Sequence, residues 1–268
     1  MARRTLYRHA DAEGVIEVVQ EPSGVRTLHF GSVSKQSSLD PQAPHRLVLP
    51  YTRILTAALL FRPKPRRILL LGLGGGALVH FFRHHFPEAQ VEAVESWPRV
   101  VSVARDFFHL PEDDPHLRIH LAEASEFIAD PGPDSAGAWD LIVADVFDAR
   151  GPAAGTLARA FYGGIQQRLE EGGVMAANLW SSNRLRLNGA LKAMADAFGR
   201  PVYRLQPRGR ANVAAFAGRP PLPEAAPDRL GRRAQELGDR IGLDYRRYLG
   251  DMEAVPKGWL VGRLTSSS

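Results

Sequence analysis

The 268-residue chain contains no cysteine, which excludes disulfide bonds, zinc sites built on thiolates and catalysis by a thiol nucleophile. It also contains no apolar run near the roughly 20 residues that a helix needs to cross a bilayer. No apolar stretch follows the arginines of the opening MARRTLYRHADAEG, so we expect no secretory signal. These absences predict a cytoplasmic protein without a membrane partner.

A metal site is not expected either. His80 and His84 fall four residues apart, on one face of a predicted helix. The adjacent Phe81 and Phe82, however, indicate that the histidines of this stretch cover an apolar surface. We therefore predict that the chain binds no metal ion.

Positive charge is concentrated near the C-terminus. The formal net charge is +5, and from Gly199 onward the chain has 13 Lys and Arg against 7 Asp and Glu. Such a region can attract phosphates, but no nucleic-acid recognition motif accompanies it. We therefore expect a solvated, arginine-rich surface and no nucleic-acid partner.

The most informative stretch is a glycine-rich turn between an apolar run and a helical pattern. The run Ile68–Leu71 is uninterrupted, as in a parallel strand buried on both faces, and helical spacing resumes over 77–86. Glycines allow positive φ and close approach of a ligand, and the next helix offers free N–H groups. The turn therefore predicts a nucleoside or nucleotide site, with an ordinary tight turn as the alternative. Its glycines are Gly72, Gly74, Gly75 and Gly76.

The sequence before this turn predicts a small β-rich unit. Two β-prone runs, Val15–Val19 and Arg26–Phe30, flank a Pro/Gly turn and indicate a hairpin. Residues 31–50 are polar and broken by prolines, and Tyr51–Phe61 has helical periodicity before Pro63. We expect an N-terminal β-rich domain with a linking helix over residues 1–62.

The rest of the chain predicts a doubly wound, mainly parallel α/β sheet, because strand and helix patterns alternate. We assign residues 63–268 to this Rossmann-like nucleoside-binding domain, which ends in a C-terminal helix. The expected strands are Ile68–Leu71, Gln90–Val94, Arg118–Leu121, Leu141–Ala144, Val174–Leu179, Val202–Leu205 and Val213–Ala217. The expected helices cover 77–86, 98–108, 123–128, 156–169 and 184–198, with Pro98 at a first position, Thr156 as an N-cap and Gly172-Gly173 as a C-cap.

Acidic residues follow three of these strands, where ligands bind in such sheets. Glu95, about 20 residues beyond the glycines, can accept hydrogen bonds from a ribose, and Glu123 can meet an adenine edge. Asp145 ends a buried strand and Asp148 follows in the next loop, so the pair can hold a cationic amine and accept its proton. The alternatives are solvated or helix-starting carboxylates. Trp97 and Trp180, also near strand ends, are candidates either to stack on a base or to pack at the rim.

These residues resemble the spermidine synthase family, the polyamine aminopropyltransferases. The resemblance is carried by the segments ILLLGLGGG, Val94-Glu95, Asp145-Val-Phe-Asp148-Ala-Arg-Gly-Pro-Ala and Phe161-Tyr162. It implies an N-terminal β domain followed by a methyltransferase-like Rossmann domain, usually in a dimer or tetramer; we expect a homodimer. It also implies transfer of an aminopropyl group from decarboxylated S-adenosylmethionine to putrescine or a related amine, without a metal.

Site roles follow from the resemblance by position. Glu95 corresponds to the ribose-binding carboxylate and Glu123 to an adenine-contacting aspartate. Asp145 corresponds to the catalytic base and Asp148 to the gate loop, whereas Gln36 resembles a glutamine that contacts the nucleoside.

The sequence also departs from the family pattern around the acceptor. Gly75 replaces an aspartate that holds the aminopropyl amine, and Asp145-Val-Phe-Asp148-Ala replaces an Asp-Ser-Ser-Asp-Pro gate loop. Pro50-Tyr51-Thr52 occupies the region of an amine-binding Tyr-His pair, which makes Tyr51 a candidate acceptor residue. Without several carboxylates, the desolvation of a polyamine is not offset.

Four functions are therefore compatible with the sequence. An aminopropyltransferase-like enzyme comes first, and a methyltransferase that uses S-adenosylmethionine itself comes next, because Gly75 leaves room for the methionine carboxylate. A nicotinamide-dependent oxidoreductase fits the glycine spacing but lacks a Tyr-x-x-x-Lys motif. A non-catalytic nucleoside-binding relative is the fourth.

Overall fold

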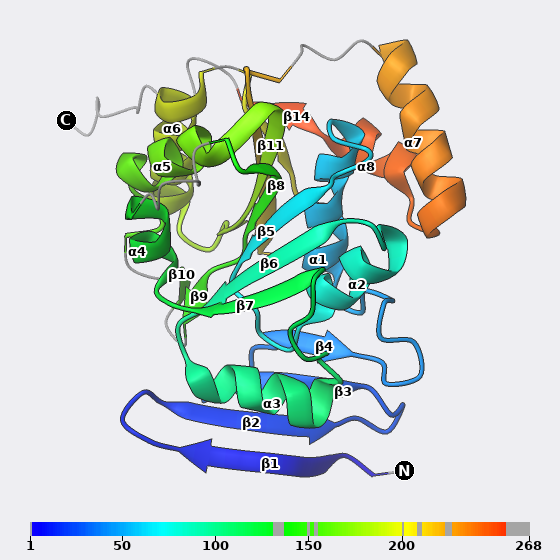
Figure 1. Ribbon diagram of the computed structural model, residues 1–268, viewed down its shortest axis with the longest axis vertical. Coiled ribbons are helices and arrows are strands. Elements are labelled where there is room, and N and C mark those ends of the chain that lie inside the picture. The colour runs from blue at the N-terminus through cyan, green and yellow to red at the C-terminus, as the bar shows by residue number, and fades with distance from the viewer. Residues whose placement is uncertain are drawn as a thin grey trace, which may run out of the picture.

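The computed structural model describes residues 2–130, 137–148, 151–152, 155–199, 201–207, 211–222 and 227–255 (Figure 1). Two sheets dominate these residues: a four-stranded sheet at the N-terminus and an eight-stranded sheet covered by helices. The predicted fold class, a methyltransferase-like α/β fold with an N-terminal β-rich part, is confirmed.

The N-terminal sheet is antiparallel, with its strands in chain order. The predicted hairpin is confirmed as β2 and β3, joined by a turn in which Gly24 has φ of 89°. Two strands extend it, β1 before the hairpin and β4 after it. The bounds are β1 (Arg4–Ala10), β2 (Val15–Gln20), β3 (Arg26–Phe30) and β4 (Ser37–Leu39).

The large sheet has the order β14-β12-β13-β11-β8-β5-β6-β7. Strands β11, β8, β5, β6 and β7 are parallel, whereas β13, β12 and β14 add antiparallel pairs at one edge. The bounds are β5 (Arg67–Leu71), β6 (Gln90–Glu95), β7 (Leu117–Leu121), β8 (Trp139–Ala144), β11 (Leu169–Trp180), β12 (Tyr203–Leu205), β13 (Asn212–Arg219) and β14 (Glu253–Ala254). A two-stranded ribbon, β9 (Phe147–Asp148) with β10 (Gly151–Pro152), lies outside it.

Helices cover both faces of this sheet, because successive apolar side chains of strand β5 point to opposite faces and each face must be buried. Ile68 and Leu70 pack into a core with α1, η1, α2, α7 and α8, whereas Leu69 and Leu71 pack into a second core with α4, α5 and α6. The bounds are α1 (Pro50–Leu55), the 3-10 helix η1 (Thr56–Leu60), α2 (Ala77–His85), α3 (Pro98–Phe108), α4 (Ala124–Ala129), α5 (Arg159–Arg168), α6 (Arg184–Phe198), α7 (Pro227–Ile241) and α8 (Tyr245–Asp251).

Helix α3 joins the two sheets (Figure 1). Its Val101 and Ala104 belong to the core of the large sheet. Its Val100, Val103 and Phe108 pack instead against N-terminal sheet residues such as Ile16 and Leu28. Because α3 buries one face in each of these two cores, it holds the N-terminal sheet against the large sheet.

Several local predictions are corrected by the structure. Thr156 is not an N-cap, because α5 begins at Arg159 and Thr156 is buried in the preceding turn. Gly172-Gly173 do not cap that helix, since it ends at Arg168 and both glycines lie within the long strand β11. Pro98 does start its helix as predicted. Strands β1 and β14 and helix α8 are not anticipated by the sequence patterns.

Candidate active site

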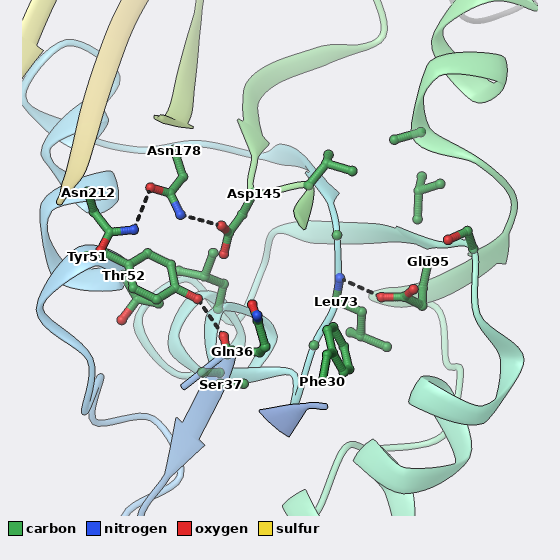
Figure 2. A pocket seen from close by; sticks show the side chains of 18 of the residues that line it. Phe30, Gln36, Ser37, Tyr51, Thr52, Leu73, Glu95, Asp145, Asn178 and Asn212 are labelled. Carbon is green, nitrogen blue, oxygen red and sulfur yellow. Dashed lines mark hydrogen bonds between the residues drawn. The ribbon is translucent and has the colours of Figure 1, made fainter. Parts of the chain in front are cut away.

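A cavity of about 720 Å³ lies at the carboxyl ends of β5, β6 and β8. The chain runs from β5 to β6 and β7 on one side, then returns to β8 on the other, so the cavity sits at the topological switch point of the sheet. The N-terminal sheet and α1 form one wall, and β11 and β13 form another (Figure 2). Its lining includes Phe30, Lys35, Gln36, Ser37, Tyr51, Thr52, Gly72, Leu73, Gly74, Glu95, Glu123, Asp145, Asn178, Trp180, Ser182 and Asn212.

The glycine turn brings two strand ends unusually close together. Gly72 has φ of 95°, and a Cβ atom there would lie 2.2 Å from the backbone oxygen of Asp145. The Gly72 N–H donates to the Val94 carbonyl at 2.9 Å, and the Asp145 N–H donates to the Leu71 carbonyl at 2.8 Å. Glycine is therefore required at position 72 by both conformation and space. These backbone contacts fix the position of Asp145 relative to the glycine turn.

Glu95 is placed at the end of β6, beside the glycine turn. Its Oε2 accepts from the Leu73 N–H at 3.3 Å and its Oε1 from the Trp97 N–H at 3.1 Å (Figure 2). Burial raises the pKa of this carboxyl, and the backbone N–H donors around it act in the opposite direction. Glu95 thus fixes the turn from inside while it lines the cavity.

Glu123 is the more exposed of the two acidic residues at this end. It is the residue before α4, and its side chain makes no capping hydrogen bond. It lines the cavity with Ala122 and Ser125, at the ends of β7 and α4. Its carboxylate is therefore available to a polar group of a ligand.

Asp145 lies deep in the cavity, one residue beyond β8. Its Oδ1 accepts from Asn178 Nδ2 at 2.8 Å (Figure 2). Burial raises its pKa to about 6, although the Asn178 amide and the Tyr51 hydroxyl favour the charged form. A carboxylate with such a pKa is ionised at neutral pH and can accept a proton.

Tyr51 connects Asp145 to the N-terminal sheet. Its hydroxyl donates to the Gln36 carbonyl at 2.8 Å, and it also interacts with Asp145 (Figure 2). Burial and the Asp145 charge hold the pKa of Tyr51 well above its usual range, so the phenol stays protonated. The sequence candidates Gln36, Tyr51 and Asp145 are therefore brought together in one corner of the cavity.

Two predicted glycines lie behind the cavity and do not line it. Gly76, with φ of 74°, is the N-cap of α2. A Cβ atom on Gly75 would lie 2.9 Å from both the Phe108 ring and Ser37 Oγ. The space beside Gly75 is therefore filled by other side chains. The side chain of Asp148 lies outside the described residues; its backbone pairs with Gly151 in the β9–β10 ribbon.

Two asparagines are absent from the sequence candidates. Asn178 of β11 and Asn212 of β13 line the cavity beside Asp145, and Asn212 Nδ2 donates to Asn178 Oδ1 at 3.1 Å. A polar residue late in the apolar run 174–179 is a signal for Asn178, but nothing local marks Asn212. Of the two tryptophans considered, Trp180 lines the cavity, whereas Trp97 packs against Phe30 with ring centroids 5.7 Å apart.

The cavity lining is acidic in balance. Among the described lining residues, Glu95, Glu123 and Asp145 outnumber a single lysine, Lys35, which lies 3.6 Å from Glu21. The charge balance favours a cationic ligand.

Within the part of the chain that the structure describes, no group of three potential metal ligands comes together. No helix in the described ranges is long and apolar enough to span a membrane.

Comparison with known proteins agrees with this geometry. Residues 49–191 match the spermine/spermidine synthase domain. A polyamine aminopropyltransferase from Chromobacterium violaceum is 31% identical over 94% of this chain and 94% of its own length. A structure described as a probable spermidine synthase from Corynebacterium glutamicum superimposes with a TM-score of 0.74 over 97% of this chain and 92% of its own, at 18% identity.

A methyltransferase is also similar to the chain. The human methyltransferase-like protein 13, solved with S-adenosylhomocysteine (SAH), is 25% identical, with a TM-score of 0.62 over 72% of this chain and 89% of its own. It shares less of the chain than the bacterial aminopropyltransferase does. The predicted resemblance is confirmed, and the chain belongs to the spermine/spermidine synthase family.

Proposed function

We propose that this protein transfers an aminopropyl group from decarboxylated S-adenosylmethionine to an amine. The observation that carries the proposal is Asp145, a half-buried carboxyl with a pKa of about 6 that lines the cavity at the switch point of the sheet. Family membership supports the same reaction.

The nucleoside of the donor is assigned to the end of the cavity beside the glycine turn. The backbone of Gly72 and Gly74 lines this end of the cavity. The carboxylate of Glu95 takes the ribose hydroxyls, and that of Glu123 takes the adenine edge. Both side chains line this end, and Glu95 is already held in place by backbone N–H groups.

The reacting end is assigned to Asp145 and Tyr51. The amine nitrogen attacks the propyl carbon bound to the sulfonium, a C–N bond forms, and the C–S bond breaks with its electrons staying on sulfur. Asp145 takes the proton that the nitrogen loses, and methylthioadenosine leaves as a neutral thioether. The step needs no oxidant or reductant, because the electron pair of the C–S bond neutralises the sulfonium and the nitrogen lone pair forms the new bond.

The acceptor site is poorer in charge than a polyamine requires. Among the described residues at this end, Asp145 is accompanied by the neutral side chains of Tyr51, Thr52, Asn178 and Asn212. A second ammonium group would lose hydration there without a facing carboxylate from the side chains that the structure describes. We therefore propose an acceptor other than putrescine.

The assembly belongs to the proposal as well. We assign residues 1–62 to an N-terminal domain and 63–268 to the Rossmann-like domain, in a cytoplasmic homodimer. The family resemblance supports this arrangement. Sedimentation of the purified protein tests the dimer.

The test of the function is release of methylthioadenosine from the decarboxylated donor in the presence of amines of different length. With the best acceptor, Asp145→Asn should lower turnover by about 100–10,000-fold, the usual contribution of a positioned base. Donor affinity should change little. Asp196→Asn, which removes an exposed carboxylate paired with Lys192 on α6, is the control. Full activity of Asp145→Asn would show that another group takes the proton.

A methyltransferase is the second candidate. The expectation that Gly75 leaves room for a methionine carboxylate is wrong, because Phe108 and Ser37 fill the space beside Gly75. The observation that favours this candidate is the similarity to a methyltransferase solved with SAH. Calorimetry with S-adenosylmethionine, its decarboxylated form and methylthioadenosine distinguishes the two, since a methyltransferase must bind the carboxylated donor more tightly.

A further inference from the structure

A chain of two side-chain amides leads from β13 to Asp145. Asn212 Nδ2 donates to Asn178 Oδ1 at 3.1 Å, and Asn178 Nδ2 donates to Asp145 Oδ1 at 2.8 Å (Figure 2). The three residues come from β13, β11 and the end of β8, which are neighbours in the sheet. Asn178 is buried, and Asn212 is partly exposed to the cavity.

The chain has a direction, because an amide donates through nitrogen and accepts through oxygen. Asn212 occupies the Asn178 oxygen, so the Asn178 nitrogen must face Asp145. Without Asn212, the Asn178 amide can turn over and present its oxygen to the carboxyl. That arrangement repels a carboxylate and accepts a hydrogen bond from a protonated acid.

We propose that Asn178 and Asn212 are positioning residues that keep Asp145 ionised and oriented as the base for the transferring amine. Asn178 acts directly, by donating to one carboxylate oxygen. Asn212 acts through Asn178, by fixing which end of the amide faces Asp145. The part of this inference that concerns turnover rests on the proposed function.

The surroundings of Asp145 leave these amides a distinct role. Tyr51 reaches Asp145 from α1, but its hydroxyl also donates to the Gln36 carbonyl. The backbone of Gly72 packs against the Asp145 backbone and offers no donor to its carboxyl. The other charged side chains in the described lining are Glu95 at the end of β6, Glu123 before α4 and Lys35 between β3 and β4. Asn178 is thus the donor to the Asp145 carboxyl for which the structure gives a defined hydrogen bond, from Nδ2 to Oδ1 at 2.8 Å.

The experiment measures the ionisation of Asp145 directly, without turnover. Carbon NMR of protein labelled at the aspartate carboxyls follows the titration, and the signal lost in Asp145→Asn identifies the residue. Asn178→Leu should raise the pKa of Asp145 by about one to two, as expected when one charge-assisted hydrogen bond is lost. Asn212→Ala should raise it by a smaller amount, whereas Asn212→Gln, which keeps a donor, should restore most of the original value.

Gln206→Ala provides the control, because Gln206 donates to Ser181 Oγ on the same side of the sheet but does not line the cavity. Its Asp145 titration should match the unmodified protein. The acidic limb of the kcat/KM profile should move upward in Asn178→Leu and Asn212→Ala by the same amounts as the titration.

The outcomes separate this inference from the proposed function. An Asp145 titration that does not move in Asn178→Leu overturns the inference even if aminopropyl transfer is observed. A titration that moves as expected, in a protein that transfers no aminopropyl group to any amine, sustains the inference and refutes the proposed function. If Asn178→Leu does not fold, Asn212→Ala alone decides, because it leaves the buried side chain of Asn178 in place.

Discussion

Replacing Asp145 with asparagine should make the protein more stable while it removes the proposed base. In the folded protein the pKa of Asp145 is about 6, against 3.8 for an ordinary aspartate. Ionisation of Asp145 therefore opposes folding at neutral pH. At 1.36 kcal/mol for each pKa unit, this cost is up to about 3 kcal/mol at pH 8.

The sign of the effect determines its dependence on pH. A carboxyl with a raised pKa contributes most favourably below pH 4, and this contribution is lost as the pH rises to about 6. Asparagine resembles the protonated acid: its oxygen can accept from Asn178 as Asp145 does now. The stability gained by Asp145→Asn should therefore be about 1–3 kcal/mol at pH 8 and close to zero at pH 4.

Urea unfolding at pH 4, 6 and 8 measures this difference, provided that the slope of free energy against urea is unchanged by the substitution. Activity with the best acceptor is measured on the same samples. A variant that is less stable at pH 8, or that is stabilised equally at pH 4 and pH 8, would refute the reasoning that ionisation of Asp145 costs folding free energy.

Four further predictions follow from the same structure. Asp114→Asn should show the opposite pH dependence, because Arg83 lowers the pKa of Asp114 to about 2: stability should fall at pH 7, and the difference should disappear as the pH drops from about 4 to about 2 in acid unfolding. Glu95→Ala should weaken methylthioadenosine binding by roughly 10–150-fold in calorimetry, and an unchanged affinity would place the ribose elsewhere. Gly72→Ala should destabilise the protein by about 2–4 kcal/mol in thermal unfolding, because its methyl group would overlap the Asp145 carbonyl. Putrescine should be a weak acceptor or none, and turnover with it of about 1–1,000 per second would contradict the account of the acceptor site.

Local patterns predicted most of the large sheet. The run Ile68–Leu71 is apolar throughout because helices bury both faces of β5, and such runs leave little ambiguity. Strand β1 escaped notice because Arg4–Ala10 is an exposed edge strand with few apolar residues. The cap assigned to Thr156 was wrong because the chain turns once more before α5 begins at Arg159. Capping residues also favour turns, so the pattern alone cannot separate the two.

The site was predictable where its residues follow predicted strands. Glu95, Glu123 and Asp145 each lie at a strand end or within two residues of one, and all three line the cavity. Asn212 could not be found in this way, since it begins an antiparallel strand far along the chain. Its place beside Asn178 depends on how β13 pairs with β11, where Asn178 lies opposite Ala214. That register is a property of the folded sheet.

The contact between β4 and the glycine turn limits how this protein can be recombined with its relatives. Ser37 Oγ and the Phe108 ring fill the space beside Gly75, so residues of the N-terminal sheet and α3 pack directly against the glycine turn. A Rossmann unit with an aspartate at position 75 would clash with these two side chains. The two parts are therefore not interchangeable modules, and chimeras should exchange the N-terminal sheet, the loop and α3 as one block.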